Sequence, residues 1–335
     1  MRKEAQILLF PELGDELEAP KPINVASIPQ RSPFRYPGGK TWFVPTFRSW
    51  ISSIFPKPQY LVEPFVGGGI ISLTALFENL VERAVMVEID DDIAAVWRAV
   101  VNGEADWLAR RIMEFDLTKD SVVREISRTP RSSKEKAFQT ILKNRTYHGG
   151  ILAAGSGFLK YGENGKGIKS RWYPATLARR LTNMNLIARR MEFRQEDGLA
   201  VIQRHAADQR AAFFIDPPYT AGGKKAGKRL YRHCELDHHR LFSICETIAG
   251  EFLMTYDNAE EVKIMARAHG FQMRLIPMTN THNATMSELV IGKDLAWLDQ
   301  YPAVGEPKVS YRVKKAANKA KTSARRTRKP EPEQA

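Results

Sequence analysis

One short run of residues, Asp216-Pro217-Pro218-Tyr219, combines groups that could activate an amine. The nitrogen of an aryl amine is a poor nucleophile because its lone pair is delocalised into the ring. Two acceptors that take hydrogen bonds from its N–H groups would localise that pair, and the Asp216 carboxylate and the Pro217 carbonyl can be those acceptors. The prolines stiffen the turn, and Tyr219 can stack on a base. The alternative is a strand-ending turn with a solvated Asp and a packed Tyr.

A second run, Glu63-Pro64-Phe65-Val66-Gly67-Gly68-Gly69, has the composition of a ligand-binding loop. Glycines allow the backbone to approach a ligand closely, and the apolar helix expected after them would point its N-terminus at that ligand. The run does not match the G-x-G-x-x-G dinucleotide pattern. The alternative is a tight turn between a strand and a helix.

Two further acids follow predicted strands. Glu88 lies about 20 residues past the glycine run, where an acid commonly accepts hydrogen bonds from ribose hydroxyls. Asp90 competes for that role, but its position is more typical of a helix N-cap. Asp197 is placed either to accept the amino group of a bound adenine nucleoside or to cap the next helix.

These residues need a sheet to position them. Apolar runs predict buried strands at residues 60–62, 84–89, 191–194, 211–215 and 251–255. Helical patterns begin near Ile70 and span about residues 91–101, 174–190, 237–248 and 258–269. This alternation predicts an α/β fold with a doubly wound, mostly parallel sheet. Residues 271–277 and 288–291 are predicted to form a final strand pair that can be antiparallel.

The alternation breaks between about residues 104 and 173. Short helices are predicted up to Lys143, and a stretch rich in glycine, basic and aromatic residues follows at 144–173. We interpret 104–173 as a mainly helical insertion. It divides an α/β domain made of residues 33–103 and 174–295. Residues 1–32 are predicted to be an N-terminal extension.

The net charge of +13 is unevenly distributed. Residues 308–329 carry ten Lys or Arg side chains and no acid, so 305–335 is predicted to be a disordered basic tail. Such a tail either aids solubility or contacts phosphates without regard to sequence. Lys224, Lys225, Lys228 and Arg229 follow Tyr219 closely and could clamp a phosphate backbone, unless they form a plain solvated loop.

Other features exclude several classes of protein. No apolar run approaches the roughly 20 residues of a membrane span, and no signal peptide is recognisable. Two cysteines suit a reducing compartment, so we expect a cytoplasmic protein without membrane attachment. His233, Cys234, His238 and His239 do not follow zinc-site spacing, so no metal is predicted.

Together these motifs resemble the Dam-like DNA adenine-N6 methyltransferases of the alpha group. Residues Phe34-Arg35-Tyr36-Pro37-Gly38-Gly39-Lys40 are similar to the first motif of the family, residues 63–69 to its cofactor motif and residues 216–219 to its catalytic motif. Weaker similarities include Asn144-Arg145-Thr146 and Glu288-Leu289. The resemblance spans about residues 33 to 292. The segment 149–171 does not match the part that reads GATC in Dam itself, so GATC is not the expected site.

The resemblance implies a Rossmann-like fold, S-adenosylmethionine as cofactor and a target-recognition role for the insertion. It implies cofactor contacts from Tyr36, Lys40, Glu63, Phe65, Gly67, Gly69, Glu88, Asp197 and Asp216, with Lys40 near the methionine end. Asp216, Pro217, Pro218 and Tyr219 would hold an adenine flipped out of duplex DNA. Asn144, Arg145 and Tyr147 would contact DNA from the insertion.

Several alternatives stay open. Cytosine-N4 methylation uses the same kind of nucleophile, although those enzymes usually carry Ser at the position of Asp216. RNA adenine methylation and a catalytically inactive DNA-binding protein are further alternatives. A separate restriction endonuclease is compatible with the sequence but not required by it. The resemblance implies a monomer or weak dimer in a bacterial or phage-infected cell, associated with the nucleoid.

Overall fold

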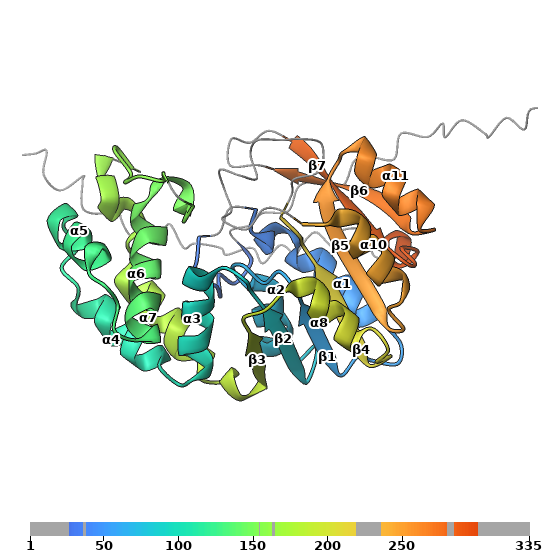
Figure 1. The fold of residues 1–335 in the computed structure, drawn as a ribbon, viewed down its shortest axis with the longest axis horizontal. Helices are drawn as coiled ribbons and strands as arrows, with labels where there is room; N and C mark the ends of the chain where they lie inside the picture. The colour runs from blue at the N-terminus through green and yellow to red at the C-terminus, as the bar shows by residue number, and fades with distance from the viewer. Residues whose placement is uncertain are drawn as a thin grey trace, which may run out of the picture. The chain divides into compact units, whose positions relative to one another are not determined.

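A seven-stranded sheet forms the centre of the computed structural model, which describes residues 27–35, 38–153, 155–162, 165–218, 236–279 and 285–300. The strands lie in the order β3-β2-β1-β4-β5-β7-β6 (Figure 1). Their bounds are β1 Tyr60–Glu63, β2 Arg83–Val87, β3 Met191–Arg194, β4 Ala211–Ile215, β5 Glu251–Asp257, β6 Gln272–Thr279 and β7 Thr285–Gly292. Strands β1 to β5 pair in parallel, whereas β7 is antiparallel to both β5 and β6. The predicted mostly parallel sheet and the antiparallel final pair are therefore confirmed.

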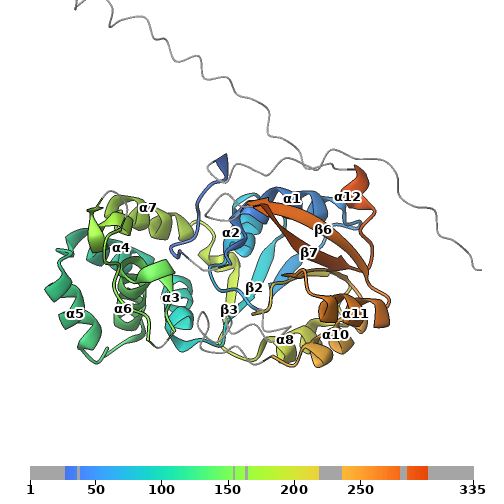
Figure 2. The same ribbon diagram turned by 90° about the horizontal axis from the view of Figure 1, so that it is seen from above.

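Helices cover both faces of this sheet (Figure 2). On one face α1 Val44–Ser53, α2 Ile70–Phe77 and α3 Asp91–Val101 share a buried apolar cluster with alternate residues of the strands. On the other face α8 Gly198–His205, α10 His238–Glu246 and α11 Glu260–Ala268 form a second cluster. Every residue of β1 and β4 is buried, as expected for central parallel strands. The doubly wound, Rossmann-like architecture is thus confirmed.

The helical insertion begins after α3. It contains α4 Ala105–Glu114, α5 Lys119–Ser127 and α6 Ser133–Thr146, followed by the short η3 His148–Gly150 and η5 Gly167–Arg171. Helix α6 packs on α3, which joins the insertion to the α/β part. Helix α7 Pro174–Met184 packs on α4, because Leu177, Leu181 and Met184 form one buried face. Helix α7 therefore lies against the helices of the predicted insertion, and the bounds of that insertion stay a prediction.

One helix is shorter than predicted. The pattern at 174–190 predicted a continuous helix, but α7 ends at Met184 and a separate turn, η6 Ala188–Arg190, leads into β3. The buried Ile187 between them kept the apolar period intact in the sequence. Helix α1 had no predicted counterpart, and α8 was foreseen only as the helix that Asp197 could cap. The short elements η2 Lys40–Phe43 and α12 Trp297–Gln300 were not predicted.

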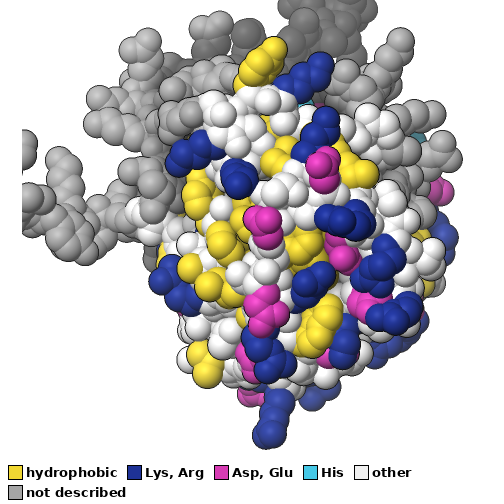
Figure 3. Space-filling model, turned by 90° about the vertical axis from the view of Figure 1, so that its left-hand side faces the viewer, with side chains coloured by type: hydrophobic (Ala, Val, Ile, Leu, Met, Phe, Trp, Pro, Cys, Tyr) yellow, Lys and Arg dark blue, Asp and Glu magenta, His cyan; other side chains and the backbone are white. Residues whose placement is uncertain are grey.

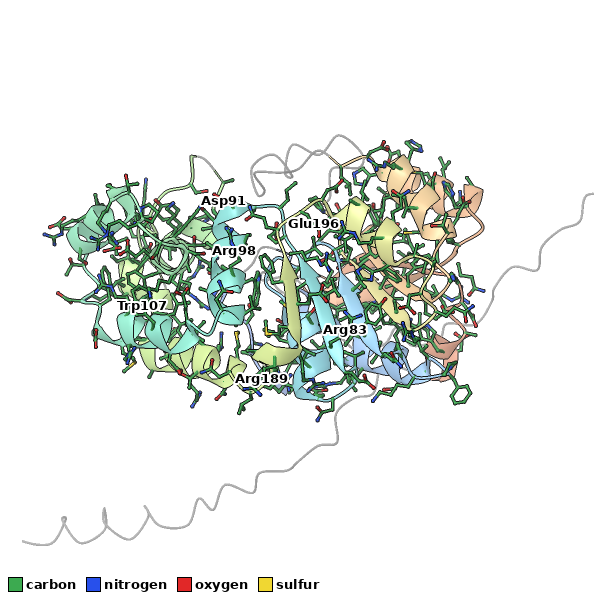
Figure 4. The ribbon with its side chains drawn as sticks, turned by 60° about the horizontal axis from the view of Figure 1, so that its bottom comes forward. Arg83, Asp91, Arg98, Trp107, Arg189 and Glu196 are labelled. Carbon is green, nitrogen blue, oxygen red and sulfur yellow. The ribbon has the colours of Figure 1, made fainter. Side chains whose placement is uncertain are left out.

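The amino ends and the carboxyl ends of the parallel strands carry different residues. Arg83 begins β2 and Arg189 precedes β3, whereas Asp91 and Glu196 follow those strands at the opposite edge (Figure 4). The carboxyl edge is the one on which the sequence places the candidate site. None of the helices within the described residues is both long and apolar enough to cross a membrane. The predicted basic tail and most of the predicted N-terminal extension lie outside the described residues.

Candidate active site

Asp216 is the first residue after β4, where the chain leaves the sheet at Pro217. Its Oδ1 accepts a hydrogen bond of 2.9 Å from Thr255 Oγ1 on the neighbouring β5. The same oxygen lies 2.8 Å from Lys40 Nζ. The carboxylate is 21% exposed, so it is fixed from the protein side and still open to a ligand.

Lys40 is buried between two carboxylates. Its Nζ lies 2.8 Å from Asp216 Oδ1 and 3.0 Å from Glu288 Oε1 on β7, and it donates to the Gly38 carbonyl at 3.1 Å. Three acceptors thus match the three protons of the ammonium group. Burial alone would lower the pKa of Lys40, but Asp216 and Glu288 outweigh it and hold the pKa above its ordinary value. The structure therefore shows Lys40 positioning Asp216, while its predicted contact with the cofactor stays a prediction.

Glu63 ends β1 and is turned into the protein. Its Oε2 accepts hydrogen bonds from the backbone N–H and the hydroxyl of Ser72, in the first turn of α2. Burial raises the pKa of Glu63 to about 8, against the lowering effect of these Ser72 bonds, and the nearby Asp216 raises it further. Glu63 therefore anchors the start of α2 in a largely protonated form at neutral pH. Its contact with the cofactor stays a prediction.

The glycine loop after β1 is shaped by Trp97 of α3. Gly69 caps α2 with a φ of 66°, and a Cβ at this position would lie 2.7 Å from Trp97 Cζ2. The Trp97 indole N–H donates to the Gly67 carbonyl at 2.9 Å. Phe65 lies against the start of α8, where a Cβ on Gly198 would come within 3.0 Å of its ring. No side chain fits at Gly69, so the loop keeps its tight path.

Glu88 directly follows β2 and faces the same loop. Its Oε2 accepts the Gly67 N–H at 3.1 Å, and its Oε1 accepts the Asp90 N–H at 2.9 Å. Burial raises the pKa of Glu88 to about 7, although the backbone N–H of Asp90 and that of Gly67 favour the charged form. Each carboxylate oxygen can accept more than one hydrogen bond, so the group can still receive a pair of hydroxyls.

Two acids act as helix caps. Asp90 accepts the N–H groups of Asp92 and Ile93 at the start of α3, which confirms its predicted role. Asp197 accepts the Leu199 N–H at 3.0 Å and caps α8. Its side chain is exposed, so capping leaves it accessible, and its predicted contact with an adenine amino group stays a prediction.

The structure brings the predicted acids to one edge. Asp197, Glu88 and Asp216 follow β3, β2 and β4, and Glu63 is the last residue of β1. The strands β3, β2, β1 and β4 are neighbours in this order. The carboxyl ends of parallel strands are where open α/β sheets bind ligands. The described residues contain no group of three or more side chains suited to a metal ion.

Two residues that are expected to contact DNA also hold the fold together. Asn144 is fully buried, accepts the Arg35 N–H at 2.8 Å, and donates to the carbonyls of Arg35 and Gly150. Arg145 is 7% exposed and donates to the Pro33 carbonyl. The structure therefore gives both side chains a structural role, because their polar groups hold the segment before η2, and their direct contact with DNA stays a prediction. Helix α6 placed them on its inner face, which its weakly periodic sequence did not reveal.

The remaining predicted residues fall into two groups. Tyr147 is half-buried at the end of α6 and packs edge-on against Phe158 at 5.2 Å, and its DNA contact stays a prediction. Tyr36, Tyr219, Lys224, Lys225, Lys228 and Arg229 lie outside the described residues.

Sequence reasoning gave no role at the site to Thr255, which bonds to Asp216, or to Glu288, which pairs with Lys40. Thr255 and Glu288 are 0% and 5% exposed, and both point at the site from β5 and β7. Glu288 carried one signal, since it is an acid at the head of an apolar strand pattern. Thr255 carried no such signal, because its hydrogen bond to Asp216 depends on the pairing of β5 with β4.

Three comparisons relate the chain to known proteins. A family model described as D12 class N6 adenine-specific DNA methyltransferase matches residues 36–272. A comparison with curated protein sequences yields no match. A solved structure from Pyrococcus horikoshii, provisionally described as an RNA methyltransferase, is similar at 10% identity and a TM-score of 0.35, over 77% of this chain and 84% of that one. A similarity at this level carries no argument about function.

Proposed function

Because the chain belongs to the D12 class N6 adenine-specific DNA methyltransferase family, we propose that it methylates adenine at specific sites in duplex DNA, with Asp216 presenting the target amine. The observation that carries this proposal is the fixed Asp216 carboxylate. Thr255 and Lys40 hold its Oδ1 at 2.9 and 2.8 Å, at the carboxyl end of β4. A carboxylate fixed in advance needs no reorganisation when charge develops on a bound amine.

S-adenosylmethionine fits the neighbouring acids. Glu88 can accept a ribose diol, and the exposed Asp197 can accept an adenine amino group. Trp97 lies so close to Gly69 that no side chain fits at this position of the glycine loop, next to these acids. Lys40, Asp216 and Glu288 together carry one negative charge when ionised, which favours a sulfonium cation. When bound, the cofactor supplies an electrophilic methyl group.

The chain's own residues would then prepare the amine. Asp216 and the Pro217 carbonyl accept its two N–H groups and localise its lone pair. Methylation makes the nitrogen cationic, so one of its protons leaves to Asp216 or to water. Holding the reacting atoms in line can supply about 7–11 kcal/mol of the barrier reduction. The base must leave the helix to reach Asp216, which requires a few kcal/mol of unstacking energy.

Modification-sensitive single-molecule sequencing of DNA from cells that express the protein tests this function, beside an Asp216→Ala control. Modified adenines within one short motif, absent from the control, would support the proposal and give the recognition site. Modified cytosines would move the function to cytosine N4. Soluble protein that binds DNA without modifying it would indicate an inactive binding protein.

A further inference from the structure

The helical insertion contains a cavity of about 460 Å³ that is partly open to solvent. It lies between α4, the turn from α5 to α6 and the first turns of α6. Pockets of this volume take small organic ligands. Figure 4 shows Trp107, which lines the cavity, in the helical part of the molecule, apart from Asp91 and Glu196 beyond the carboxyl ends of the strands. The cavity is therefore separate from the candidate active site.

Charged side chains line much of this cavity, and the arginines outnumber the acids. They are Arg111, Arg128, Arg131, Glu125 and Glu135, which leaves one positive charge in excess. Arg128 bridges the two acids, with Nη2 2.8 Å from Glu125 and Nη1 2.7 Å from Glu135. Arg111 lies 3.4 Å from Glu125, and Arg131 lies 3.3 Å from Glu135. Three guanidinium groups thus share two carboxylates, so a bound anion would balance the remaining charge.

Aromatic rings form another part of the wall. Trp107 of α4 and Phe138 of α6 both line the cavity. The Arg111 guanidinium lies 4.9 Å from the centre of the Phe138 ring and 5.5 Å from that of Phe115, which holds its plane against the wall. Trp107 is half-buried, and Lys134 Nζ lies 5.4 Å from the centre of its ring. An indole ring and a stacked guanidinium are the flat surfaces on which nucleic-acid bases stack.

The aromatic wall distinguishes the cavity from the surface around it. Figure 3, which faces the helical end of the molecule, shows Lys and Arg interspersed with Asp and Glu, so mixed charge is ordinary there. The combination of guanidinium groups with flat rings inside a cavity is what indicates a ligand with both an anionic and a planar part.

The surrounding fold keeps the cavity in shape. Gln139 is 4% exposed and donates to the carbonyls of Glu125 and Arg128 at 2.8 Å each, which fixes the turn from α5 to α6. The Arg131 N–H donates to Glu135 at 2.8 Å, whereas the Arg131 side chain is 83% exposed. Most of the wall is therefore formed before a ligand arrives, which lowers the entropic cost of binding.

We propose that this cavity binds a nucleotide. The base lies against Trp107 and the guanidinium plane of Arg111. The phosphate accepts hydrogen bonds from Arg128 and Arg131, because guanidinium groups match the geometry of phosphate oxygens. Glu125 accepts an amino or hydroxyl group of the base or sugar. The ligand is either a free nucleotide or a nucleotide of a DNA strand, since both carry these groups, and the site does not depend on the proposed function.

Isothermal titration calorimetry of the full-length protein with dGMP tests this site. A guanine nucleotide is chosen because the residues at the carboxyl edge are expected to take adenine. Arg111→Gln/Arg131→Gln should raise the Kd for dGMP at least about tenfold, since it removes two cations from the wall. The matched control Arg110→Gln/Arg124→Gln removes the same charge from exposed residues of α4 and α5 that do not line the cavity, and it should keep the wild-type Kd.

Two single variants separate the parts of the ligand. Trp107→Leu should raise the Kd for dGMP about tenfold and leave the weaker binding of inorganic phosphate unchanged, because only the base stacks. Arg131→Gln changes an 83% exposed side chain, so weaker dGMP binding at wild-type thermal stability excludes a folding defect. Heat of dGMP binding that persists in a saturating duplex supports a free nucleotide, whereas displacement of dGMP by the duplex supports a nucleotide of the strand.

Several outcomes would overturn the proposal. They are the absence of dGMP binding at millimolar concentration, and equal Kd values in the cavity variants and the control. Displacement of dGMP by S-adenosylmethionine would place it at the carboxyl edge, and phosphate that binds as tightly as dGMP would reduce the cavity to an anion site. Failure of the wild type to methylate DNA would count against the proposed function alone, because every readout here is a binding measurement.

Discussion

Replacing Lys40 with methionine removes the ammonium group that lies between Asp216 and Glu288. The side chain is 4% exposed, and methionine fills nearly the same space without charge. The two carboxylates would then lose their shared cation, with Glu288 only 5% exposed. Asp216 would also keep only Thr255 among its two observed partners. We expect Lys40→Met to lower both the free energy of unfolding and the rate of methylation.

The size of the effect follows from burial. Breaking a buried ion pair by removing one partner typically costs about 3–5 kcal/mol, because the other charge is stranded. The 21% exposure of Asp216 places this site near the lower end, at about 3 kcal/mol. Glu288→Gln keeps the pair of Lys40 with Asp216, so it should cost only about 1 kcal/mol. The double variant should be more stable than the sum of the two changes predicts, because the two residues are in contact.

Urea denaturation with linear extrapolation measures these differences. Lys57→Met is the matched control, since Lys57 is exposed and should respond within about 0.5 kcal/mol. If Lys40→Met lowers the free energy of unfolding by no more than the control does, the reasoning is refuted. So would strict additivity in the double variant, because it would mean that Lys40 and Glu288 do not stabilise each other.

Three further outcomes are expected. Glu63 has a pKa raised to about 8 from 4.5, so its contribution to stability is full below about pH 4.5 and is lost as pH rises through 8. In urea titrations, Glu63→Gln should remove this loss of roughly 1.4 kcal/mol per pH unit. The same dependence of the unfolding free energy on pH in the wild type and in the variant would contradict this expectation. Gly69→Ala should destabilise the protein by about 1–3 kcal/mol and weaken S-adenosylmethionine binding in calorimetry, because its Cβ would clash with Trp97; wild-type values would show that the loop can yield. Asn144→Ala should lower the urea midpoint by the equivalent of about 2 kcal/mol through lost buried hydrogen bonds, whereas weaker DNA binding at unchanged stability would contradict this structural role and support the predicted DNA contact.

The strands of the sheet could be predicted where an apolar run is followed by residues that end a strand. The strand Ala211–Ile215 is a continuous apolar run that ends at Asp216 and two prolines, and β1 ends at a glycine loop. Helix α1 was missed because it is rich in aromatic and β-branched residues, and α8 was foreseen only through its cap Asp197. Their stability comes from packing on the sheet rather than from local propensity.

The site was predictable where chemistry follows directly from chain order. Glu63, Glu88, Asp197 and Asp216 each come after a strand, so a parallel sheet must bring them to one edge. Contacts made through strand pairing could not be seen in the same way. Glu288 reaches Lys40 only because β7 inserts antiparallel between β5 and β6. The inward direction of Asn144 and Arg145 depends likewise on the segment that covers them.

The segment from Arg31 to Arg35 contacts both the glycine loop and the helical insertion. Ser32 bonds to Gly68 of the glycine loop, and Phe34 packs on Trp97 at 5.8 Å, while Asn144 and Arg145 hold the same segment from the insertion. We therefore expect a ligand that shifts the glycine loop to affect the insertion through this segment. Thermodynamic reciprocity then requires that cofactor and DNA change each other's affinity by the same factor. We therefore expect a substitution in this segment to alter that shared factor.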